Sequence, residues 1–185
     1  MEIKNLVKAF GDKVIFNGNS FIFPENKITY LMGESGCGKT TLLRIISGLD
    51  TDFLGEIIKK SDFISCVFQE PRLFNSLTVK QNLEIVDKAS SLTYEELLEL
   101  VELGVEENSY PESLSGGMKM RLSLARALCY NGDIFLMDEP FSALDEAMKD
   151  RLLPKVFELL KGKTVIIISH DFEEAQKYAD NIITL

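Results

Sequence analysis

Hydrophobic positions along the chain form short continuous runs in some segments and recur at helical spacing in others. Residues 28–32 are a short apolar run before a glycine-rich turn, and residues 40–49 then show helical spacing. Further runs at 65–68, 134–137 and 165–168 are rich in β-branched or aromatic side chains, and each ends at a polar residue. Such runs are typical of parallel strands that are buried on both faces. The alternation predicts an α/β fold with a mostly parallel sheet and flanking helices.

The middle of the chain has a different pattern. Residues 79–86 and 94–103 repeat Leu and Val at intervals of three and four, with acidic residues on the other face. This periodicity predicts amphipathic helices. We therefore expect a single domain, with a core made of residues 1–68 and 116–185 and a helical subdomain inserted at about 69–115.

Composition narrows the class of protein. The chain has 185 residues, of which 45% are hydrophobic and 26% charged, which excludes a wholly disordered, collagen-like or disulfide-framework chain. Its apolar runs fall short of the roughly 18 residues that span a bilayer, and the N-terminal segment lacks the apolar region of a secretory signal. The three cysteines, Cys37, Cys66 and Cys129, are far apart and odd in number, which favours a reduced cytosolic setting.

The charge is acidic and uneven. Lys and Arg total 20 against 29 Asp and Glu, which gives a formal charge of −9. Residues 84–112 hold nine acids against Lys88 alone, and we interpret this segment as the solvated face of the predicted helices. Because the chain has no long basic run to release counterions from a phosphate backbone, nucleic acid is not expected as a partner.

A phosphate-binding motif follows the first predicted parallel strand. Residues 33–40 read GESGCGKT, the P-loop pattern of Gly, four residues, Gly, Lys and Ser or Thr. In a strand-to-helix turn, successive N–H groups and the helix N-terminus face an anion. Lys39 is expected to reach the β- and γ-phosphates of ATP and Thr40 to bind Mg²⁺, whereas a glycine-rich turn that binds nothing is the alternative. The predicted ATP-binding residues of this segment are Gly33, Glu34, Ser35, Gly36, Cys37, Gly38, Lys39, Thr40 and Thr41.

Two adjacent acids follow the predicted strand at residues 134–137. Ligands of open α/β sheets bind in the crevice at the carboxyl ends of the strands, so Asp138 and Glu139 are expected beside the P-loop. Asp138 would hold Mg²⁺ through its water shell, and Glu139 would act as a general base on the attacking water. Since turns and helix caps use the same residue types, the acid pair by itself leaves a structural role open.

Further motifs follow in order. Residues 114–118 read LSGGM and precede KMRLSLARAL, Gln69 lies in VFQEPRLF, residues 142–145 end the stretch DEPFSALD, and His170 lies in VIIISHD. Together with the P-loop and the acid pair, these segments closely resemble the motifs of ABC-type ATPases over nearly the whole chain. The resemblance implies a P-loop NTPase, with a RecA-like mostly parallel sheet, an inserted α-helical subdomain and an N-terminal antiparallel β part.

The resemblance also implies the roles of these residues. Phe10 lies where the family places an aromatic side chain that stacks on adenine. The signature of one copy covers the ATP held by the P-loop of another, which implies a head-to-tail dimer, formed with an identical chain or a similar ATPase. The implied catalytic residues are Glu139, His170, Lys39 and Gln69; the implied Mg²⁺ residues are Thr40, Gln69 and, through water, Asp138; the signature is Ser115, Gly116, Gly117 and Met118; and the D-loop is Ser142, Ala143, Leu144 and Asp145.

The signature also makes physical sense without the family. Ser115, Gly116 and Gly117 precede a predicted helix, so a hydroxyl, bare backbone amides and the positive helix end converge at one place, which suits a phosphate. An ordinary serine-capped helix start is the alternative. The family's signature usually ends in Gln, so Met118 puts in doubt the polar contact that such a side chain makes.

An ATPase of this kind needs a partner to which its motion is coupled. The stretch QEPRLFNSLTVKQNL resembles importer-type ATP-binding subunits, especially those of nitrate, sulfonate and taurine uptake systems. This implies an ABC transporter subunit in the cytoplasm, peripheral on the cytosolic face of the inner membrane, with integral membrane subunits and a substrate-binding protein as partners. Apolar surface for a helix of those membrane subunits is expected from Phe68, Pro71, Leu73 and Phe74.

Other functions remain open at this point. The same kind of subunit also serves exporters, and a soluble ABC ATPase coupled to a non-transport protein or nucleic-acid machine is the alternative from another class. A small-molecule kinase is disfavoured because the signature has no role in it. The transported substrate is not readable from this chain, because other subunits recognise it.

Overall fold

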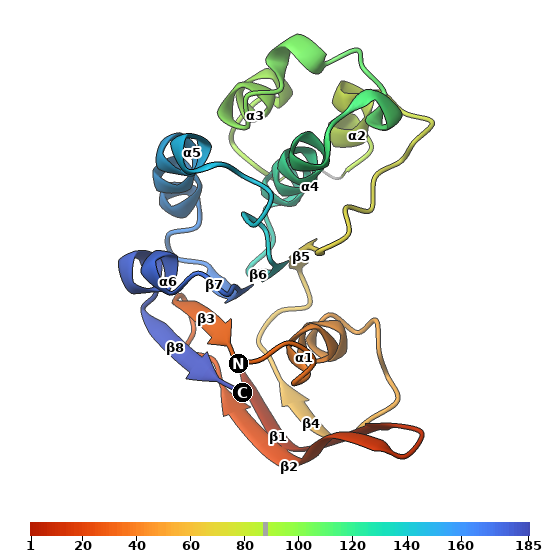
Figure 1. The fold of residues 1–185 in the computed structure, drawn as a ribbon, viewed down its shortest axis with the longest axis vertical. Coiled ribbons are helices and arrows are strands. Elements are labelled where there is room, and N and C mark those ends of the chain that lie inside the picture. The colour runs from red at the N-terminus through yellow and green to blue at the C-terminus, as the bar shows by residue number, and fades with distance from the viewer. Residues whose placement is uncertain (87–88) are drawn as a thin grey trace.

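The computed structural model describes residues 1–86 and 89–185, and its elements are shown in Figure 1. Asp87 and Lys88, which enter the charge count of the acidic segment, lie outside the described residues. The strands are β1 (Glu2–Phe10), β2 (Lys13–Ile22), β3 (Ile28–Met32), β4 (Leu54–Ile58), β5 (Ile64–Val67), β6 (Ile134–Asp138), β7 (Thr164–Ile168) and β8 (Asn181–Thr184). The helices are α1 (Lys39–Ile46), α2 (Val79–Glu84), α3 (Tyr94–Leu100), α4 (Gly116–Tyr130), α5 (Glu146–Leu159) and α6 (Phe172–Tyr178), with short 3₁₀ turns at Gly104–Glu106 and Pro111–Ser113.

The main sheet has the strand order β5-β6-β7-β3-β8, and each neighbouring pair is parallel. β6 and β7 are buried along their whole length. Strands covered on both faces need apolar side chains at every position, which explains the continuous runs in the sequence. The predicted parallel sheet is confirmed, with the runs at 28–32, 65–68, 134–137 and 165–168 forming β3, β5, β6 and β7 to within one residue.

A second sheet, with the order β2-β1-β4, is antiparallel. Ile3 and Leu6 on β1 and Phe16 and Phe21 on β2 are buried in one cluster with side chains of α1. This sheet is the N-terminal antiparallel part that the family resemblance implies. The start of β2 approaches the turn between β3 and α1, since a Cβ on Gly38 in that turn would lie 2.6 Å from Ile15 Cγ2. Figure 1 shows both sheets and α1.

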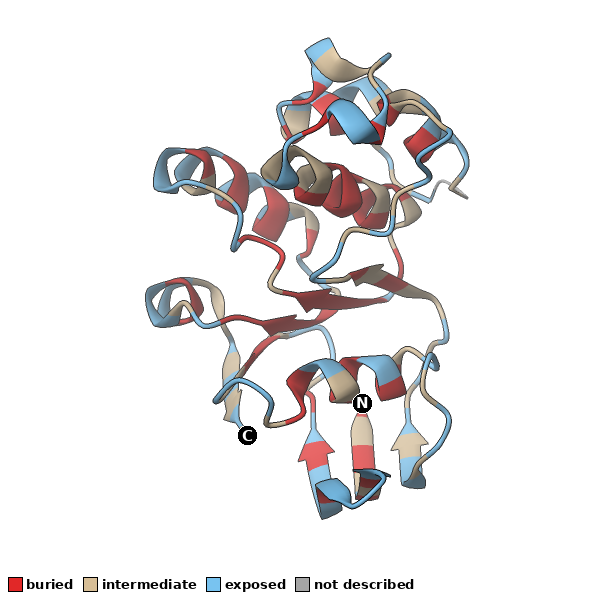
Figure 2. Cartoon of the chain, turned by 45° about the vertical axis from the view of Figure 1, so that its right-hand side comes forward, coloured by how far each residue is buried: buried red, intermediate tan, exposed pale blue. Residues whose placement is uncertain are grey.

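The main sheet lies between two hydrophobic clusters. Leu136 and Ile166 pack toward α1 and the antiparallel sheet, whereas their strand neighbours Phe135 and Val165 pack toward α4 and α5. Successive strand residues point to opposite faces, so each strand contributes to both clusters. Figure 2 shows the buried residues on either side of the sheet. The carboxyl ends of β3, β6 and β7 are therefore fixed by packing from both sides.

The first two helices of the helical subdomain, α2 and α3, begin at capping boxes. Thr78 and Thr93 each form a capping box, with Gln81 and Glu96, so α2 and α3 begin at the first residues of the predicted helices. Both helices end earlier than the predicted 86 and 103, at Glu84 and Leu100. α4 packs against α2 and α3 on one side and β5 on the other. The subdomain and the core thus share a hydrophobic cluster, and the boundary at about 69–115 stays a prediction.

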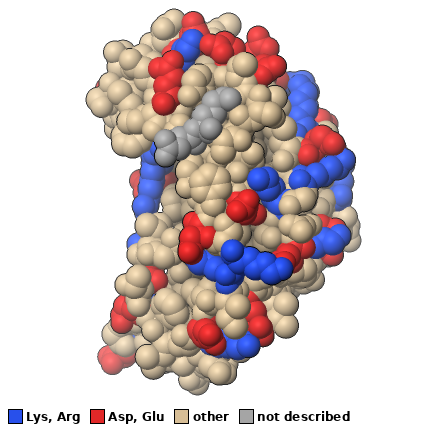
Figure 3. All heavy atoms as spheres, turned by 180° about the vertical axis from the view of Figure 1, so that it is seen from behind, with Lys and Arg blue, Asp and Glu red and all other residues tan. Residues whose placement is uncertain are grey.

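Charged side chains are distributed unevenly over the surface. Acidic side chains gather over the helical subdomain, at the top of the face in Figure 3, whereas acids and bases alternate lower down. The glutamates of α3 and of its flanks are exposed, namely Glu95, Glu96, Glu99 and Glu102. In the described residues, no helix combines the length and the apolar character that crossing a membrane requires.

Candidate nucleotide-binding site

The P-loop connects the end of β3 to the start of α1. Gly36 and Gly38 have φ values of 80° and 112°, which residues with a Cβ atom rarely adopt. In addition, a Cβ on Gly38 would lie 2.6 Å from Ile15 Cγ2. Gly38 is the N-cap of α1 and supplies no side-chain cap. The first N–H groups of α1 therefore remain available to an anion at this end of the helix.

Lys39 is buried in this loop, with 6% of its surface exposed. Its Nζ atom donates hydrogen bonds of 2.8 Å to the carbonyl oxygens of Gly33 and Glu34. An ammonium group has three N–H donors, and the third is directed at Cys37 Sγ at 3.9 Å, a weak acceptor that a phosphate oxygen can replace. The loop thus fixes the position of its own cation through the backbone of the residues before it.

Thr40 and Asp138 join the P-loop to the end of β6. Thr40 Oγ1 donates a hydrogen bond of 2.6 Å to Asp138 Oδ2, and Asp138 is 2% exposed. Burial raises the pKa of the Asp138 carboxyl, while the Thr40 hydrogen bond and the charge of Lys39 oppose that rise. The sheet therefore brings together two of the three residues that the sequence predicted for Mg²⁺, and the third, Gln69, lines the same pocket.

Glu139 occupies a strained backbone position beside His170. Its φ is 51°, in the left-handed region, and its N–H donates a 3.0 Å hydrogen bond to the carbonyl oxygen of Ile168 at the end of β7. His170 Nε2 lies 3.3 Å from Glu139 Oε1, which is buried and accepts no hydrogen bond from the described residues. Burial raises the pKa of the Glu139 carboxyl, nearby Asp138 raises it further, and His170 opposes the rise.

These side chains line one pocket of about 320 Å³. Of the predicted residues, the pocket brings together Phe10, Ser35, Gly36, Gly38, Lys39, Thr40, Thr41, Gln69, Asp138, Glu139 and His170. Among the residues predicted for ATP, catalysis or Mg²⁺, three do not line it: Gly33, Glu34 and Cys37. Two of them supply carbonyl groups to Lys39, and Cys37 lies half-buried in the loop with its Sγ atom 3.9 Å from Lys39 Nζ.

Sequence reasoning missed three residues of the pocket wall: Lys13, Ile15 and Ile168. Ile168 could have been found, because it ends the predicted strand that precedes His170. Lys13 and Ile15 lie at the start of β2, whose pairing with β1 brings them beside Phe10. None of the motifs quoted in the sequence includes Lys13 or Ile15, so these two residues carried no local signal.

Phe10 offers an aromatic surface at the mouth of the pocket. It is 53% exposed, an unusual state for a phenylalanine. Lys8 Nζ lies 4.6 Å from the ring centroid and is itself held by Asp50 Oδ1 at 2.9 Å. A buried cation against the ring fixes its orientation. An exposed, oriented ring suits stacking on a nucleotide base.

The signature and the D-loop meet in a separate pocket of about 250 Å³. Ser115 caps α4 by accepting a hydrogen bond from the Met118 N–H at 3.3 Å, and Asp145 caps α5 in the same way through Met148. Ser115, Gly117, Met118, Ala143, Leu144 and Asp145 line the pocket, whereas Gly116 and Ser142 do not. The pocket therefore joins the N-terminal ends of two helices.

Gly117 lies directly against the D-loop. A Cβ at Gly117 would lie 2.9 Å from the Ala143 carbonyl oxygen, whereas a Cβ at Gly116 would meet nothing within 4 Å. Met118 is half-buried and packs on the cluster beneath α4. Its side chain therefore contributes apolar packing at the position where the family usually has Gln.

The site residues of the chain thus form two separate groups. The P-loop, the acid pair, Gln69 and His170 line one pocket, whereas the signature and the D-loop line the other. The first offers an ammonium, N–H groups, a hydroxyl, an amide and two carboxylates around one volume, a set of groups that suits a nucleoside triphosphate and a water molecule. The second offers a hydroxyl and two helix N-terminal ends at the surface, and its two carboxylates, Glu102 and Asp145, are held by Arg151 and by the Met148 N–H.

Comparison with known proteins agrees with this geometry. A family model described as ABC transporter matches residues 16–142. The aliphatic sulfonates import ATP-binding protein SsuB 2 of Pseudomonas syringae pv. tomato is 36% identical over 100% of this chain and 82% of its own length. The SsuB protein of Bacillus cereus is 38% identical over 98% of this chain and 78% of its own, and the Fe(3+) ions import ATP-binding protein FbpC 2 of Haemophilus influenzae is 34% identical over 98% and 58%.

Solved structures agree as well. A dimeric, post-hydrolysis state of the ATP-binding cassette MJ0796 bound to ADP and Pi has a TM-score of 0.85 and is 28% identical, covering 100% of this chain and 93% of its own. A second dimeric structure of MJ0796, described as a bacterial ABC transporter cassette, has a TM-score of 0.82 and is 29% identical with the same coverage.

Proposed function

This chain belongs to the ABC transporter family and is an ATP-binding ATPase of that family, and we propose that it drives import by hydrolysing ATP in a head-to-tail dimer bound to separate membrane subunits. The observation that carries the proposal is the split of its site residues between two pockets. Each pocket holds half of what ATP hydrolysis in this family requires, so a second copy completes the site.

Nucleotide binding is the task of the P-loop pocket. Phe10 stacks on the base, and the N–H groups at the start of α1 bind phosphate oxygens. Lys39 is held by two loop carbonyl groups, and its remaining N–H binds the terminal phosphates. Because the loop fixes the ammonium before ATP arrives, little ordering is needed on binding.

The residues around Asp138 fit a magnesium ion. They are hard oxygen donors, the hydroxyl of Thr40, the carboxylate of Asp138 and the amide of Gln69, in the same pocket as the phosphate-binding loop. A bound ion would supply positive charge against the phosphates. Thr40 would supply a hydroxyl ligand, and Asp138, which is buried and already hydrogen-bonded, would hold the ion through water.

Glu139 is the general base. Its Oε1 atom accepts no hydrogen bond from the described residues, so it is available to orient a water molecule. Its raised pKa increases its affinity for the proton of that water. His170, 3.3 Å away, orients the carboxylate and the γ-phosphate, and Gln69 lies at the border with the helical subdomain, where it senses the occupied site.

Membrane subunits dock beside Gln69, in this proposal. Phe74 is 45% exposed, and its backbone N–H and carbonyl group are both hydrogen-bonded by the buried side chain of Asn82, at 3.0 and 3.1 Å. The Arg126 guanidinium lies 5.0 Å from the Phe74 ring centroid. The apolar side chain is thus held at the surface by a rigid loop, which suits a helix of the cytosolic face of a membrane subunit. We accordingly propose that the subunit lies in the cytoplasm, peripheral to the inner membrane.

Two measurements test the proposed function. The purified protein should release phosphate from ATP without any acceptor, and Lys39→Ala should weaken ATP binding about 10- to 100-fold.

Affinity purification from the native cell should recover multispan membrane subunits, together with a substrate-binding protein for an importer. Phe74→Glu should abolish that recovery while ATP binding is unchanged. Recovery of soluble partners alone would favour the non-transport ATPase, the alternative function.

The transported substrate is recognised by the partner subunits, so the first substrate to test is chosen from the names of the relatives. The relatives are named for aliphatic sulfonates and for Fe(3+) ions, although all of them are ATP-binding proteins of import systems. We propose a small anion of the sulfonate class as the first substrate to test, because several of the most similar relatives are named for it. Uptake of a labelled alkanesulfonate, lost in a strain that carries Glu139→Gln, tests this choice.

A further inference from the structure

Glu102 has an unusual backbone conformation for a glutamate. It directly follows Val101, the C-cap of α3, and its φ is 53°, in the left-handed region. Its N–H donates a 3.0 Å hydrogen bond to the Glu99 carbonyl oxygen and so ends the helix. Glycine or asparagine is the usual residue at such a position, because a Cβ disfavours the conformation. A side chain kept there against its backbone preference points to a task for that side chain.

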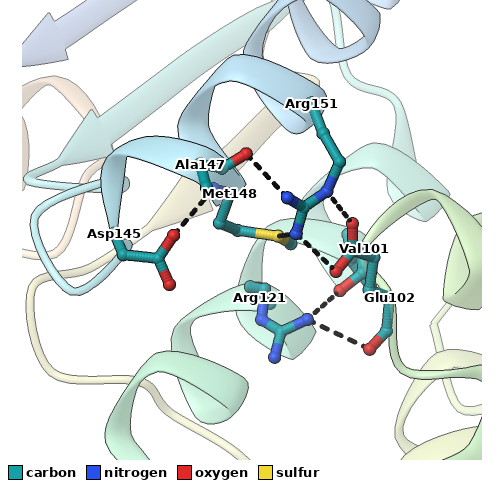
Figure 4. A network of polar contacts seen from close by, with 7 residues as sticks. All are labelled: Val101, Glu102, Arg121, Asp145, Ala147, Met148 and Arg151. Carbon is teal, nitrogen blue, oxygen red and sulfur yellow. Dashed lines mark hydrogen bonds and ion pairs between the residues drawn. The ribbon is translucent and has the colours of Figure 1, made fainter.

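The carboxylate of Glu102 binds the helix that follows the D-loop. Arg151 on α5 donates from Nε to Oε1 at 2.7 Å and from Nη2 to Oε2 at 3.1 Å, the two-point geometry of an arginine and a carboxylate. Arg151 Nη1 also donates to the Ala147 carbonyl oxygen at 2.9 Å. The guanidinium is therefore fixed to the first turn of α5, next to Asp145 of the D-loop (Figure 4).

The backbone of the same segment binds the signature helix. Arg121 lies on α4, six residues after Ser115, and its Nη1 atom donates to the carbonyl oxygens of Val101 at 2.6 Å and Glu102 at 3.0 Å. Glu102 is thus in contact with α4 through its main chain and with α5 through its side chain (Figure 4). We call these contacts the Glu102 junction. Its three residues also line the pocket that contains the signature and the D-loop.

We propose that Glu102 is a positioning residue that holds the signature and the D-loop at a fixed separation, so that both meet a second copy of this chain together. The inference rests on the proposed head-to-tail dimer. The signature and the D-loop begin different helices, α4 and α5, and a small relative rotation of these helices would separate the two surfaces. A surface that is already ordered loses less free energy on association than one that must be ordered first.

The expected effect is moderate, because the Arg151 and Glu102 side chains are 55% and 44% exposed. Loss of such a pair weakens an interaction about fivefold. A symmetric dimer contains two junctions, so the dimer association constant should fall by up to about 25-fold. ATP binding to the monomer should not change, because none of the three residues lines the P-loop pocket.

The test uses the full chain with Glu139→Gln, so that ATP is bound but not turned over. ATP-dependent dimerisation is measured by analytical ultracentrifugation for Glu102→Gly, which also relieves the backbone conformation, and for Arg151→Met. Both should weaken the dimer, while the urea stability of Glu102→Gly should not fall. Lys80→Met is the matched control, because its 2.8 Å ion pair with Glu95 joins α2 and α3 and does not reach α5.

The outcomes separate this inference from the proposed function. Recovery of dimerisation by the exchanged pair, Glu102→Arg with Arg151→Glu, would support the junction. Unchanged dimerisation in both single variants would overturn it, and so would an equal loss in Lys80→Met. If the protein with Glu139→Gln alone stays monomeric at saturating ATP, the proposed dimer itself is wrong, and the junction has no second copy to position.

Discussion

Thr40 Oγ1 donates a hydrogen bond of 2.6 Å to Asp138 Oδ2, across 98 residues of sequence. The bond links the helix after the P-loop to the end of β6, although β7 lies between β6 and β3 in the sheet. The two oxygen-bearing side chains that we propose for Mg²⁺ are therefore in direct contact. The packing of the fold supplies the free energy that ordering these two side chains requires.

Asp138→Asn should uncouple ATP binding from Mg²⁺. The amide keeps the size of the side chain but loses the negative charge that attracts the hydrated ion. We expect the increase in ATP affinity on adding Mg²⁺ to shrink about 10-fold or more, while affinity in EDTA stays the same. Titration with a fluorescent ATP analogue, with and without Mg²⁺, measures both quantities. An equal loss of affinity in EDTA would instead indicate damage to the P-loop.

The acid limb of the ATPase pH profile should report Glu139. A general base must be deprotonated, and burial raises the pKa of Glu139 above its ordinary value of 4.5, so the rate should fall as the pH drops through a midpoint above that value. The contact with His170 lowers this pKa. His170→Ala should therefore reduce the rate and move the limb to higher pH. A limb that moves to lower pH would contradict this arrangement.

Gly117→Ala should destabilise the fold where Gly116→Ala does not. The new methyl group at 117 would lie 2.9 Å from the Ala143 carbonyl oxygen, so the D-loop or the start of α4 must shift. Overpacking of this kind costs about 1–3 kcal/mol. The Cβ at Gly116 meets no atom within 4 Å, so its substitution should change the free energy of unfolding by less than about 0.5 kcal/mol. Urea unfolding of the two variants makes the comparison.

The free energy of unfolding should also depend on pH, through the buried carboxyl group of Glu174, which lines neither the P-loop pocket nor the signature pocket. Burial, aided by the charge of Asp171, raises the pKa of Glu174 to about 6, and Tyr30 donates a 2.9 Å hydrogen bond to it. The folded protein therefore binds this proton more tightly than the unfolded chain, so the group's contribution is full below pH 4.5 and is lost as the pH rises through about 6. The loss amounts to about 2 kcal/mol.

Glu174→Gln removes that titration and keeps an acceptor for Tyr30. It should raise the free energy of unfolding by about 2 kcal/mol at pH 7.5, with the gain disappearing toward pH 4.5. Glu173→Gln, on the exposed side of the same helix, is the control and should change little at either pH. A gain for Glu174→Gln that is independent of pH would contradict the assignment.

Much of the fold and site follows from local sequence patterns. The strands of the main sheet are buried on both faces, so their runs are continuous and their ends carry the site residues Asp138 and His170. The P-loop motif places Lys39 and Thr40 because its glycines adopt conformations that few other residues can.

Tertiary relationships did not follow from those patterns. The early end of α3 depends on Glu102, whose left-handed conformation carries no sequence signal, since glutamate is a good helix former. Lys13 and Ile15 enter the nucleotide pocket only through the pairing of β2 with β1. The close approach of Gly117 to Ala143 depends on the packing of α4 against the D-loop.

The central claim is that ATP is held between two copies of this chain, and it is tested most directly with Glu139→Gln. The substitution should slow hydrolysis about 10²–10⁴-fold while leaving the P-loop intact, so ATP accumulates in the bound state. Light scattering after size-exclusion chromatography with saturating ATP and Mg²⁺ gives the mass of the particle. The account predicts twice the mass of one chain with ATP and the mass of one chain without it. The mass of one chain under both conditions, with ATP bound, would contradict it.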